Sequence, residues 1–471
     1  MKRSLVFVLC LFLITRITSS QNIVDNKAIT GSWMGKIAAG AISLRVIFNI
    51  SLADQDSLTA TLDSPDQGVT DIKIGPVTFD GRNLNIKAPL LLGEYTGTLK
   101  NDTIFEGTWI QAGKSSELNL TRLKSPLILI RPQEPKPPFP YSAEDVTFKN
   151  QKHNIILAGT LTIPEGNGPF PAVVLITGSG AQNRDEEIMG HKPFHVIADH
   201  LSRNDIAVLR YDDRGVGRSQ GNYSTATSAD LATDAEAALK YLRSIPKVNP
   251  ELTGLAGHSE GGFIAPMIAA SDHETAFIIS LAGTGVTGEK ILMKQNYDIG
   301  KASGISEKQL SLSLSANKKL FSIIKKEPDN EKAIEEMRIT YRKILEKEKI
   351  SPEDEEAAMK ELENSFGTLT SHWFRYFLVR DPAVFWKRVK CPVLAINGTM
   401  DLQVNADINL KAISKALRSG GNTKVTIIKP EGLNHLFQHS STGSPQEYGE
   451  IEVTISPEIL KTMSEWINGL K

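Results

Sequence analysis

The chain has 471 residues, 40% of them hydrophobic and 23% charged, and a formal net charge of −1. This composition is that of a globular protein, and the length favours two domains or one large decorated domain. The chain lacks the basic excess of a nucleic-acid-binding protein, so we expect no nucleic-acid partner.

Residues 1–20 predict a signal peptide. Two basic residues precede the apolar run 5–14, which is too short to span a bilayer but has the length of a signal-peptide core. Small residues at 18–20 offer a cleavage site. We therefore expect export to the periplasm or the medium, without stable membrane association after cleavage; an uncleaved membrane anchor is the alternative. Cleavage would leave Cys391 alone, predicted to be a buried structural thiol, with no partner for a disulfide.

Residues 21–130 predict a small all-β domain, a barrel or a sandwich. Short alternating apolar runs, such as 43–48, recur between turn signals. Trp33 and Trp109 could line a ligand cavity, but we expect them in the core because large aromatic side chains usually carry core burial. Five prolines within 131–140 then predict a stiff, extended linker and the domain boundary.

The region 141–471 predicts an α/β domain with a mostly parallel sheet flanked by helices. Near-continuous apolar runs are typical of strands buried on both faces, and they alternate here with amphipathic helical patterns such as 227–243. An antiparallel strand at 155–161 is predicted to lead into the sheet. The further predicted strands are 171–177, 206–211, the strand that runs into Ser259, 276–281, 392–397 and 424–429.

The segment 289–385 interrupts this alternation with several amphipathic helices. An insertion at this point reaches the carboxyl edge of the strands, so we expect a cap over the active site, with a solvated decoration as the alternative. Its aromatic cluster comprises Trp373, Phe374, Tyr376 and Phe377. The cluster could form an acyl-binding wall or dock the cap, and we take Trp373 and Phe374 as candidate substrate-binding residues.

The motif Gly257-His258-Ser259-Glu260-Gly261 predicts a nucleophile elbow. Gly-x-Ser-x-Gly lies here between an apolar strand and a small-residue helix. The glycines are needed because a Cβ at either position would collide with the neighbouring strand or helix. A serine hydroxyl is a poor nucleophile near neutral pH, so Ser259 requires a base, and the base requires a carboxylate to orient it.

Asp401 and His435 are the predicted partners of Ser259. Each follows a predicted strand, and the chain order Ser, Asp, His is that expected for such an elbow. Taken singly, Asp401 could cap the next helix and His435 could be a structural loop histidine, with His439 close by. Order and position together predict a triad with Ser259 as nucleophile, His435 as general base and Asp401 as its orienting acid.

The oxyanion of the reaction needs preorganised donors. We expect one from the backbone amide of Glu260 and the second from Ser179, with Gly180 as the alternative. Asp213 and Arg214 are predicted to form a structural ion pair. The sequence contains no metal-binding pattern and no nucleotide fingerprint, so we expect neither a metal nor a cofactor.

From residue 141 to its end, the chain resembles α/β-hydrolase esterases of the serine-aminopeptidase-like branch, and among them bacterial two-domain esterases with an N-terminal β domain. The resemblance is carried by residues 177–185, 191–194, 211–219, 257–262 and 398–404. It implies the α/β-hydrolase fold, carboxylesterase activity on short acyl esters, and a triad of Ser259, Asp401 and His435. Thr177 departs from the family, since many members have His there.

The sequence therefore predicts a serine hydrolase that cleaves a small-molecule carboxylic ester through an acyl-enzyme. A serine peptidase or aminopeptidase is one alternative, because the same triad cleaves amides and the Glu260 side chain could act on substrate amines. A catalytically silent binding protein is the alternative from another class. It would be favoured by the loss of a triad residue, whereas all three are present.

Overall fold

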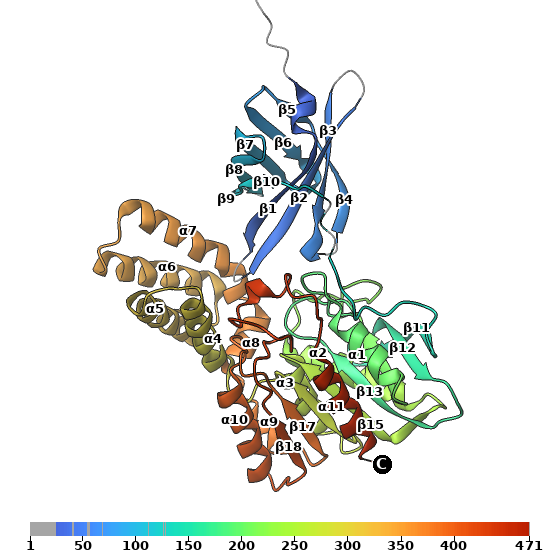
Figure 1. Cartoon of the computed structure of the whole chain (residues 1–471). Helices are drawn as coiled ribbons and strands as arrows, with labels where there is room; N and C mark the ends of the chain where they lie inside the picture. The colour runs from blue at the N-terminus through green and yellow to red at the C-terminus, as the bar shows by residue number, and fades with distance from the viewer. Residues whose placement is uncertain are drawn as a thin grey trace, which may run out of the picture. The chain divides into compact units, whose positions relative to one another are not determined.

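The structure is a computed structural model that describes residues 25–39, 42–53, 57–67, 69–111, 113–125, 127 and 129–470. The predicted signal peptide lies outside these residues. The chain divides into two compact units (Figure 1). The first lies within residues 1–127, and the second comprises 128–471 together with the short segments 38–44 and 65–68. Among the described helices, none combines the length and the apolar character that a membrane crossing needs.

The first unit is an antiparallel sheet with the strand order β4-β3-β2-β1-β10-β8-β7-β6-β5, and β9 pairs with β8. The sheet curls so that β4 approaches β6 and β3 approaches β5, which gives the predicted barrel-like form. Its strands are β1 (Gly31–Ala39), β2 (Ile42–Leu52), β3 (Leu58–Ser64), β4 (Val69–Ile74), β5 (Val77–Phe79), β6 (Asn83–Ala88), β7 (Gly93–Asn101), β8 (Ile104–Gln111), β9 (Lys114–Glu117) and β10 (Leu120–Arg122).

Aromatic side chains fill the interior of the first unit. Trp33 is fully buried, donates its indole N–H to the carbonyl of Ile29 over 2.8 Å, and meets the ring of Phe105 edge-on at 4.7 Å. Trp109 is buried in the same cluster and packs against Phe48. Both tryptophans are thus core residues, as the sequence predicts.

The second unit is built on an eight-stranded sheet with the order β11-β12-β14-β13-β15-β16-β17-β18. The pairs β11–β12 and β12–β14 are antiparallel, and the remaining pairs are parallel. This arrangement, with helices on both faces, is the predicted α/β-hydrolase fold. The strands are β11 (Tyr141–Asn150), β12 (Ile155–Pro164), β13 (Phe170–Ile176), β14 (Ala207–Tyr211), β15 (Val248–His258), β16 (Ile278–Leu281), β17 (Val393–Ile396) and β18 (Val425–Ile428).

Two apolar cores cover the two faces of this sheet. Along β13, Ala172, Val174 and Ile176 enter one core, while Val173 and Leu175 enter the other, because successive side chains of a strand point to opposite faces. The near-continuous apolar run in the sequence follows from this double burial. The first core is closed by α2 (Ser228–Arg243), α3 (Gly261–Ala269), α9 (Ala383–Trp386) and α10 (Ala406–Ser419), and the second by α1 (Pro193–Ser202) and α11 (Pro457–Asn468).

Five helices lie between β16 and α9, where the sequence predicts a cap. They are α4 (Gly288–Ala302), α5 (Glu307–Lys326), α6 (Asn330–Lys347), α7 (Pro352–Leu369) and α8 (His372–Val379). Each of the last four begins at a side chain that accepts a hydrogen bond from the first-turn backbone, namely Ser306, Asp329, Ser351 and Ser371.

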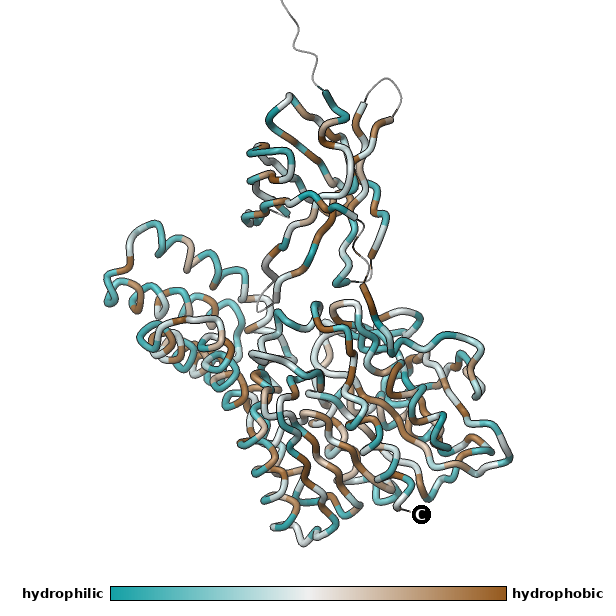
Figure 2. Tube along the Cα trace, in the orientation of Figure 1, coloured by the Kyte–Doolittle hydropathy of each residue, from teal (hydrophilic) through white to brown (hydrophobic). Residues whose placement is uncertain are grey.

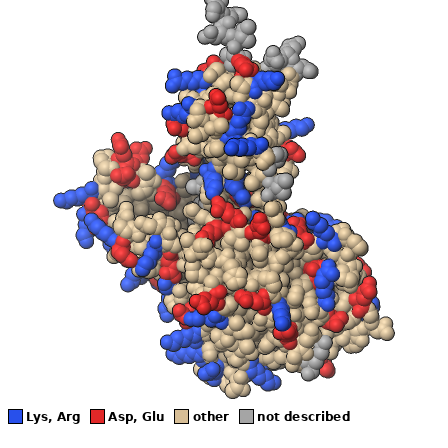
Figure 3. Space-filling view, in the orientation of Figure 1, with Lys and Arg blue, Asp and Glu red and all other residues tan. Residues whose placement is uncertain are grey.

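The cap helices share an apolar core of their own. They alternate apolar and polar positions along the chain, as Figure 2 shows by hydropathy. On the face drawn in Figure 3, acidic and basic side chains intermingle over these helices.

Candidate active site

Ser259 lies on a strained turn between β15 and α3. Its φ of 50° falls in the left-handed region, which a non-glycine residue rarely adopts. The Ser259 amide donates to the carbonyl of Leu281 over 2.9 Å, which ties the turn to the neighbouring strand. A Cβ at Gly257 would collide with the carbonyl of Gly261, and one at Gly261 with the carbonyl of Ile176. The two glycines therefore allow the close approach that this turn requires.

Asp401 and His435 are joined by a hydrogen bond of 2.8 Å between Oδ2 and Nδ1. Asp401 follows β17 and is almost fully buried, and its Oδ1 accepts the amides of Gln403 and Val404 at 2.8 Å each. His435 follows β18 and is also buried. The carboxylate assigns the proton of the neutral imidazole to Nδ1, so that Nε2 is left as a proton acceptor.

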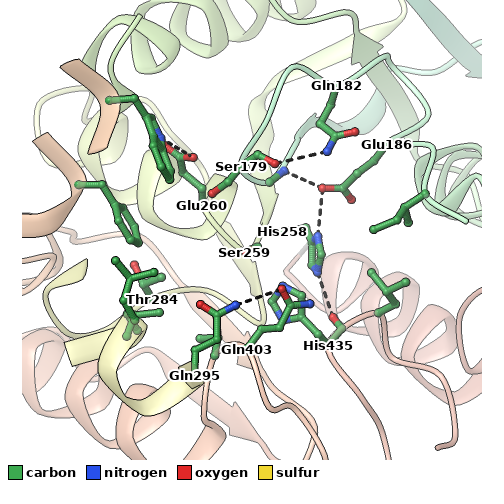
Figure 4. Close-up of a pocket in the computed structure, with 18 residues that line it drawn as sticks. Ser179, Gln182, Glu186, His258, Ser259, Glu260, Thr284, Gln295, Gln403 and His435 are labelled. Atoms are coloured by element: carbon green, nitrogen blue, oxygen red, sulfur yellow. Dashed lines mark hydrogen bonds and ion pairs between the residues drawn. The ribbon is translucent and has the colours of Figure 1, made fainter. Parts of the chain in front are cut away.

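Ser259 and His435 line the same cavity of about 260 Å³ (Figure 4). No hydrogen bond joins the Ser259 hydroxyl to His435 within the described residues, and such bonds are often long before substrate binds. The apolar part of the wall comes from Ile188, Ile291, Leu292, Trp373, Phe377, Val404 and Leu436, and the polar part from Ser179, Gln182, Glu186, His258, Glu260, Thr284, Gln295 and Gln403. Helices α4 and α8 of the insertion thus form part of the wall, as expected of a cap.

The backbone amides near Ser259 differ in whether they are already engaged. Within the described residues, neither the amide of Glu260 nor that of Ser179 donates to another protein group, and both residues line the cavity. The Gly178 amide donates to Glu186 Oε1 over 2.6 Å, and the Gly180 amide donates to the hydroxyl of Tyr223 over 2.9 Å. Ser179 therefore remains the candidate for the second oxyanion donor, and the alternative, Gly180, is engaged elsewhere.

The predicted ion pair between Asp213 and Arg214 is wrong. Arg214 instead pairs with Asp234, with 2.7 Å between Nε and Oδ2. The Asp213 carboxyl bonds the hydroxyl of Thr177 and accepts the amide of Gln182, each over 2.9 Å, so it holds both ends of the loop that carries Ser179. Burial raises the pKa of Asp213 to about 8.

The side chain of Glu260 is buried at the cavity wall, and burial raises its pKa. Its carboxyl accepts the Ser228 hydroxyl over 2.5 Å and the indole N–H of Trp373 over 2.8 Å, and it also hydrogen-bonds the side chain of Ser179. Glu260 thereby links the elbow to cap helix α8.

The structure places Phe374 outside the cavity wall, whereas the sequence predicts that it binds substrate. Trp373 and Phe377 lie one turn apart on α8, stack with ring centroids 5.3 Å apart, and face the cavity. Phe374 lies about 100° round the helix from Trp373, and it packs against Phe321 in the core of the cap. The aromatic cluster thus divides between the cavity wall and the docking of the cap.

Glu186 and His258 are site residues that the sequence analysis missed. His258 lies within 3.0 Å of both Glu186 Oε1, through Nδ1, and the carbonyl oxygen of His435, through Nε2. No sequence signal indicated this pair, because 72 positions separate Glu186 from His258 and the residue before the nucleophilic serine varies freely in the elbow motif. Within the part of the chain that the structure describes, no group of His, Cys, Asp or Glu side chains is arranged to hold a metal ion.

The chain is similar to a known family and to several known proteins. The family model described as "Serine aminopeptidase, S33" matches residues 191–344, which include Ser259 but neither Asp401 nor His435. Esterase EstD of Thermotoga maritima is 28% identical over 336 residues, which cover 69% of this chain and 68% of that protein. A putative carboxymethylenebutenolidase of Synechocystis is 29% identical over 147 residues, covering 30% of this chain and 58% of the relative.

Among solved structures, the alpha/beta hydrolase GrgF of Penicillium is 16% identical and has a TM-score of 0.44, covering 70% of this chain and 98% of its own. The strand order, the elbow and the matches to EstD and the aminopeptidase model lead to one assignment. The second unit has the α/β-hydrolase fold, and it is similar to an esterase and to the serine-aminopeptidase family model.

Proposed function

We propose that the protein is a serine esterase that hydrolyses small carboxylic esters with short acyl groups. One observation carries the proposal. Ser259, on its strained turn, faces the same cavity as His435, whose Nδ1 is bonded to the buried carboxylate of Asp401.

In the proposed mechanism, His435 Nε2 removes the proton from the Ser259 hydroxyl as the serine oxygen attacks the ester carbonyl carbon. The carbonyl oxygen gains negative charge and is stabilised by the amides of Glu260 and Ser179. The C–O bond to the alcohol then breaks, and the alcohol leaves with the proton from His435. A water molecule, deprotonated by His435, attacks the acyl-enzyme, and the acid is released as the Ser259 hydroxyl re-forms.

The size and lining of the cavity support a short acyl group. Its volume of about 260 Å³ is small beside the roughly 300–1,000 Å³ of pockets for drug-sized ligands. Trp373 and Phe377 form an apolar wall that suits an acyl chain. Similarity to esterase EstD supports ester hydrolysis as the reaction.

An aminopeptidase is the second candidate, favoured by the description of the matching family model. Such an enzyme needs a carboxylate free to bind the substrate amine. Glu260 is the acidic side chain beside the nucleophile, but Ser228, Trp373 and Ser179 already bond its oxygens. Rates on p-nitrophenyl esters of two to twelve carbons and on aminoacyl p-nitroanilides would separate the two, and we expect the two- to six-carbon esters to react fastest.

Labelling with a fluorophosphonate probe tests the nucleophile. We expect the full chain to be labelled and to hydrolyse p-nitrophenyl acetate, and Ser259→Ala to do neither. A folded wild-type protein that is not labelled would contradict the proposal and favour a silent binding protein.

We also propose that the protein is exported and that residues 1–20 are removed, so that the mature chain begins at Gln21. Lys2, Arg3 and the apolar run 5–14 support this. Intact mass spectrometry of the protein from a secreting host would show a chain starting at Gln21. A mass that includes Met1 would favour the membrane anchor.

A further inference from the structure

His258 makes two hydrogen bonds from a buried position beside the nucleophile. Its ring lies 3.0 Å from Glu186 Oε1 through Nδ1 and 3.0 Å from the carbonyl oxygen of His435 through Nε2. Both side chains are less than a tenth exposed. The proposed mechanism uses neither of them.

The partners of His258 indicate its protonation state. The carbonyl oxygen of His435 only accepts, so Nε2 carries a proton. Glu186 Oε1 also accepts the amide of Gly178 over 2.6 Å, as expected of a carboxylate. Nδ1 then carries a proton as well, and His258 is an imidazolium. Burial alone would lower the pKa of His258. The pKa is nevertheless raised, because the charge and the hydrogen bond of Glu186 outweigh burial, together with the His435 carbonyl and the charge of Asp401.

The pair joins three segments of the site. Glu186 holds the amide of Gly178, which precedes the oxyanion candidate Ser179. His258 precedes Ser259 in the chain and holds the backbone of the base, His435. A single buried contact therefore connects the oxyanion loop, the elbow and the histidine loop.

The backbone at Glu186 supports a functional need for this side chain. Its φ is 50°, a conformation in which glycine or asparagine would be less strained. Beside the pair, Phe194, Leu281 and Phe437 line a small apolar space of about 10 Å³. Because both side chains are buried, the attraction between the two charges is screened less than at the surface.

We propose that Glu186 and His258 are positioning residues, which hold the oxyanion loop and the base loop at the spacing that the reaction of Ser259 requires. This inference rests on the proposed esterase function. The titratable groups that face His258 are Glu186, His435, whose ring centroid is 4.7 Å away, and Asp401.

Two variants test the pair kinetically. Glu186→Gln keeps an acceptor for Gly178 and His258 but removes the charge, and His258→Gln keeps one donor and cannot titrate. We expect kcat on p-nitrophenyl acetate to fall about 10- to 100-fold in each variant, because a small misplacement of catalytic groups lowers kcat strongly. KM should stay within about threefold of the wild-type value. The double variant should be no slower than the slower single variant, because the two residues act as a unit.

Matched control variants come from the same protein. Glu187→Gln alters the neighbouring carboxylate, which accepts from Asn183, and His200→Gln removes a half-buried imidazole of α1 that bonds Ser464 of α11. Both should keep wild-type kcat. Thermal melting followed by circular dichroism shows which variants are folded. If only one of Glu186→Gln and His258→Gln folds, its kinetics alone test the positioning role.

The pH profile separates positioning from a merely structural role. Wild-type kcat/KM should fall on the alkaline side as His258 loses its proton. Without the carboxylate, burial favours neutral His258, so Glu186→Gln should move the alkaline limb to lower pH. His258→Gln should lose that limb. Folded variants with wild-type kcat and an unchanged alkaline limb would overturn the inference.

Nitrogen NMR of ¹⁵N-histidine-labelled protein tests the pair without relying on activity. At pH 7.5, His258 should show two protonated ring nitrogens in the wild type and in Ser259→Ala, and Glu186→Gln should lose one of them. A neutral His258 in the wild type would overturn the inference. A charged pair in a wild-type protein that neither hydrolyses esters nor reacts with a fluorophosphonate would instead contradict the proposed function.

Discussion

At the residue scale, the carboxylate of Asp401 divides its two oxygens between two partners. Oδ1 accepts two amides of its own loop, and Oδ2 accepts the imidazole N–H of His435. The loop thereby fixes the carboxylate, and the carboxylate fixes the ring. This explains why an aspartate that could have been a simple helix cap lies behind a histidine instead.

Replacing Asp401 by a residue of the same size should stop His435 from acting as the base while leaving the packing of the site unchanged. In Asp401→Asn, the amide can donate to Nδ1 and move the imidazole proton to Nε2, where it faces Ser259. We expect kcat on p-nitrophenyl acetate to fall by about 10³–10⁴, as for such a change in other triads. Steady-state kinetics on the full chain measure this, with Asp407→Asn on the exposed face of α10 as control. A loss below about tenfold would show that Asp401 does not orient the base.

Asp213 should make stability depend on pH. Its pKa of about 8 lies above the value near 4 of an unfolded aspartate, so the folded state binds the extra proton between these two values. The stability contributed by this proton is present below about pH 4 and is lost as pH rises through about 8. Asp213→Asn, which mimics the protonated acid, should retain activity and flatten the fall in stability between pH 5 and pH 9.

Urea denaturation at pH 5, 7 and 9 checks this prediction. The control is Asp205→Asn, a change at an exposed residue, which should leave the pH slope unchanged. If Asp213→Asn showed the wild-type slope, Asp213 would be ionised in the folded protein at pH 7.

At the element scale, α8 presents different faces to the cavity and to the cap. Trp373 and Phe377 are four residues apart and line the cavity, whereas Phe374 belongs to the apolar core of the cap. The indole N–H of Trp373 bonds Glu260 beside the nucleophile, which fixes the rotation of the helix. The helix therefore forms one wall of the cavity that we propose to bind the acyl group.

Shortening Phe377 should therefore change acyl preference, while shortening Phe374 should not. Phe377→Leu enlarges the cavity by roughly the volume of one methylene, and we expect the best p-nitrophenyl ester to become about one carbon longer, at roughly 0.8 kcal/mol for each buried methylene. Phe374→Leu should lower the melting temperature of the cap and keep the wild-type preference. Rates of both variants on p-nitrophenyl esters of increasing chain length test this prediction. A changed preference in Phe374→Leu alone would show that the face of α8 carrying Phe374, rather than Phe377, contacts the acyl chain.

At the scale of the whole molecule, the two units have separate cores. The core of the first is drawn from residues 29–120, and the two cores of the hydrolase sheet are drawn from residues 148–467. Each unit buries its own apolar side chains, so each should unfold in its own transition.

Trp33→Ala should unfold the first unit selectively. Removing a fully buried tryptophan costs about 3–5 kcal/mol, and Trp33 lies in the core of the β unit alone. We expect the corresponding transition to move to lower temperature, while the rate of ester hydrolysis by the folded second unit stays within about twofold of wild type. Calorimetry combined with activity measurement tests this. A parallel loss of activity would show that hydrolysis depends on the β unit.

Much of the fold could be predicted because the burial of a strand or helix determines the pattern of apolar residues along it. The strand predicted at 171–177 is β13 at Phe170–Ile176, and that predicted at 392–397 is β17 at Val393–Ile396. Both are continuous apolar runs because both faces of the sheet are covered. The cap prediction succeeded for a similar reason, since charged amphipathic helices interrupt those runs.

The elbow, with its glycines, and the chain order of Ser259, Asp401 and His435 were determined by the sequence alone, because each depends on local geometry or on the ends of recognisable strands. Only the tertiary structure decided that Phe374 turns into the cap, that Arg214 pairs with Asp234 rather than Asp213, and that Glu186 meets His258. These are contacts between segments distant in the sequence or choices between faces of one helix. They depend on how the chain packs in three dimensions, for which no local pattern of residue types is a guide.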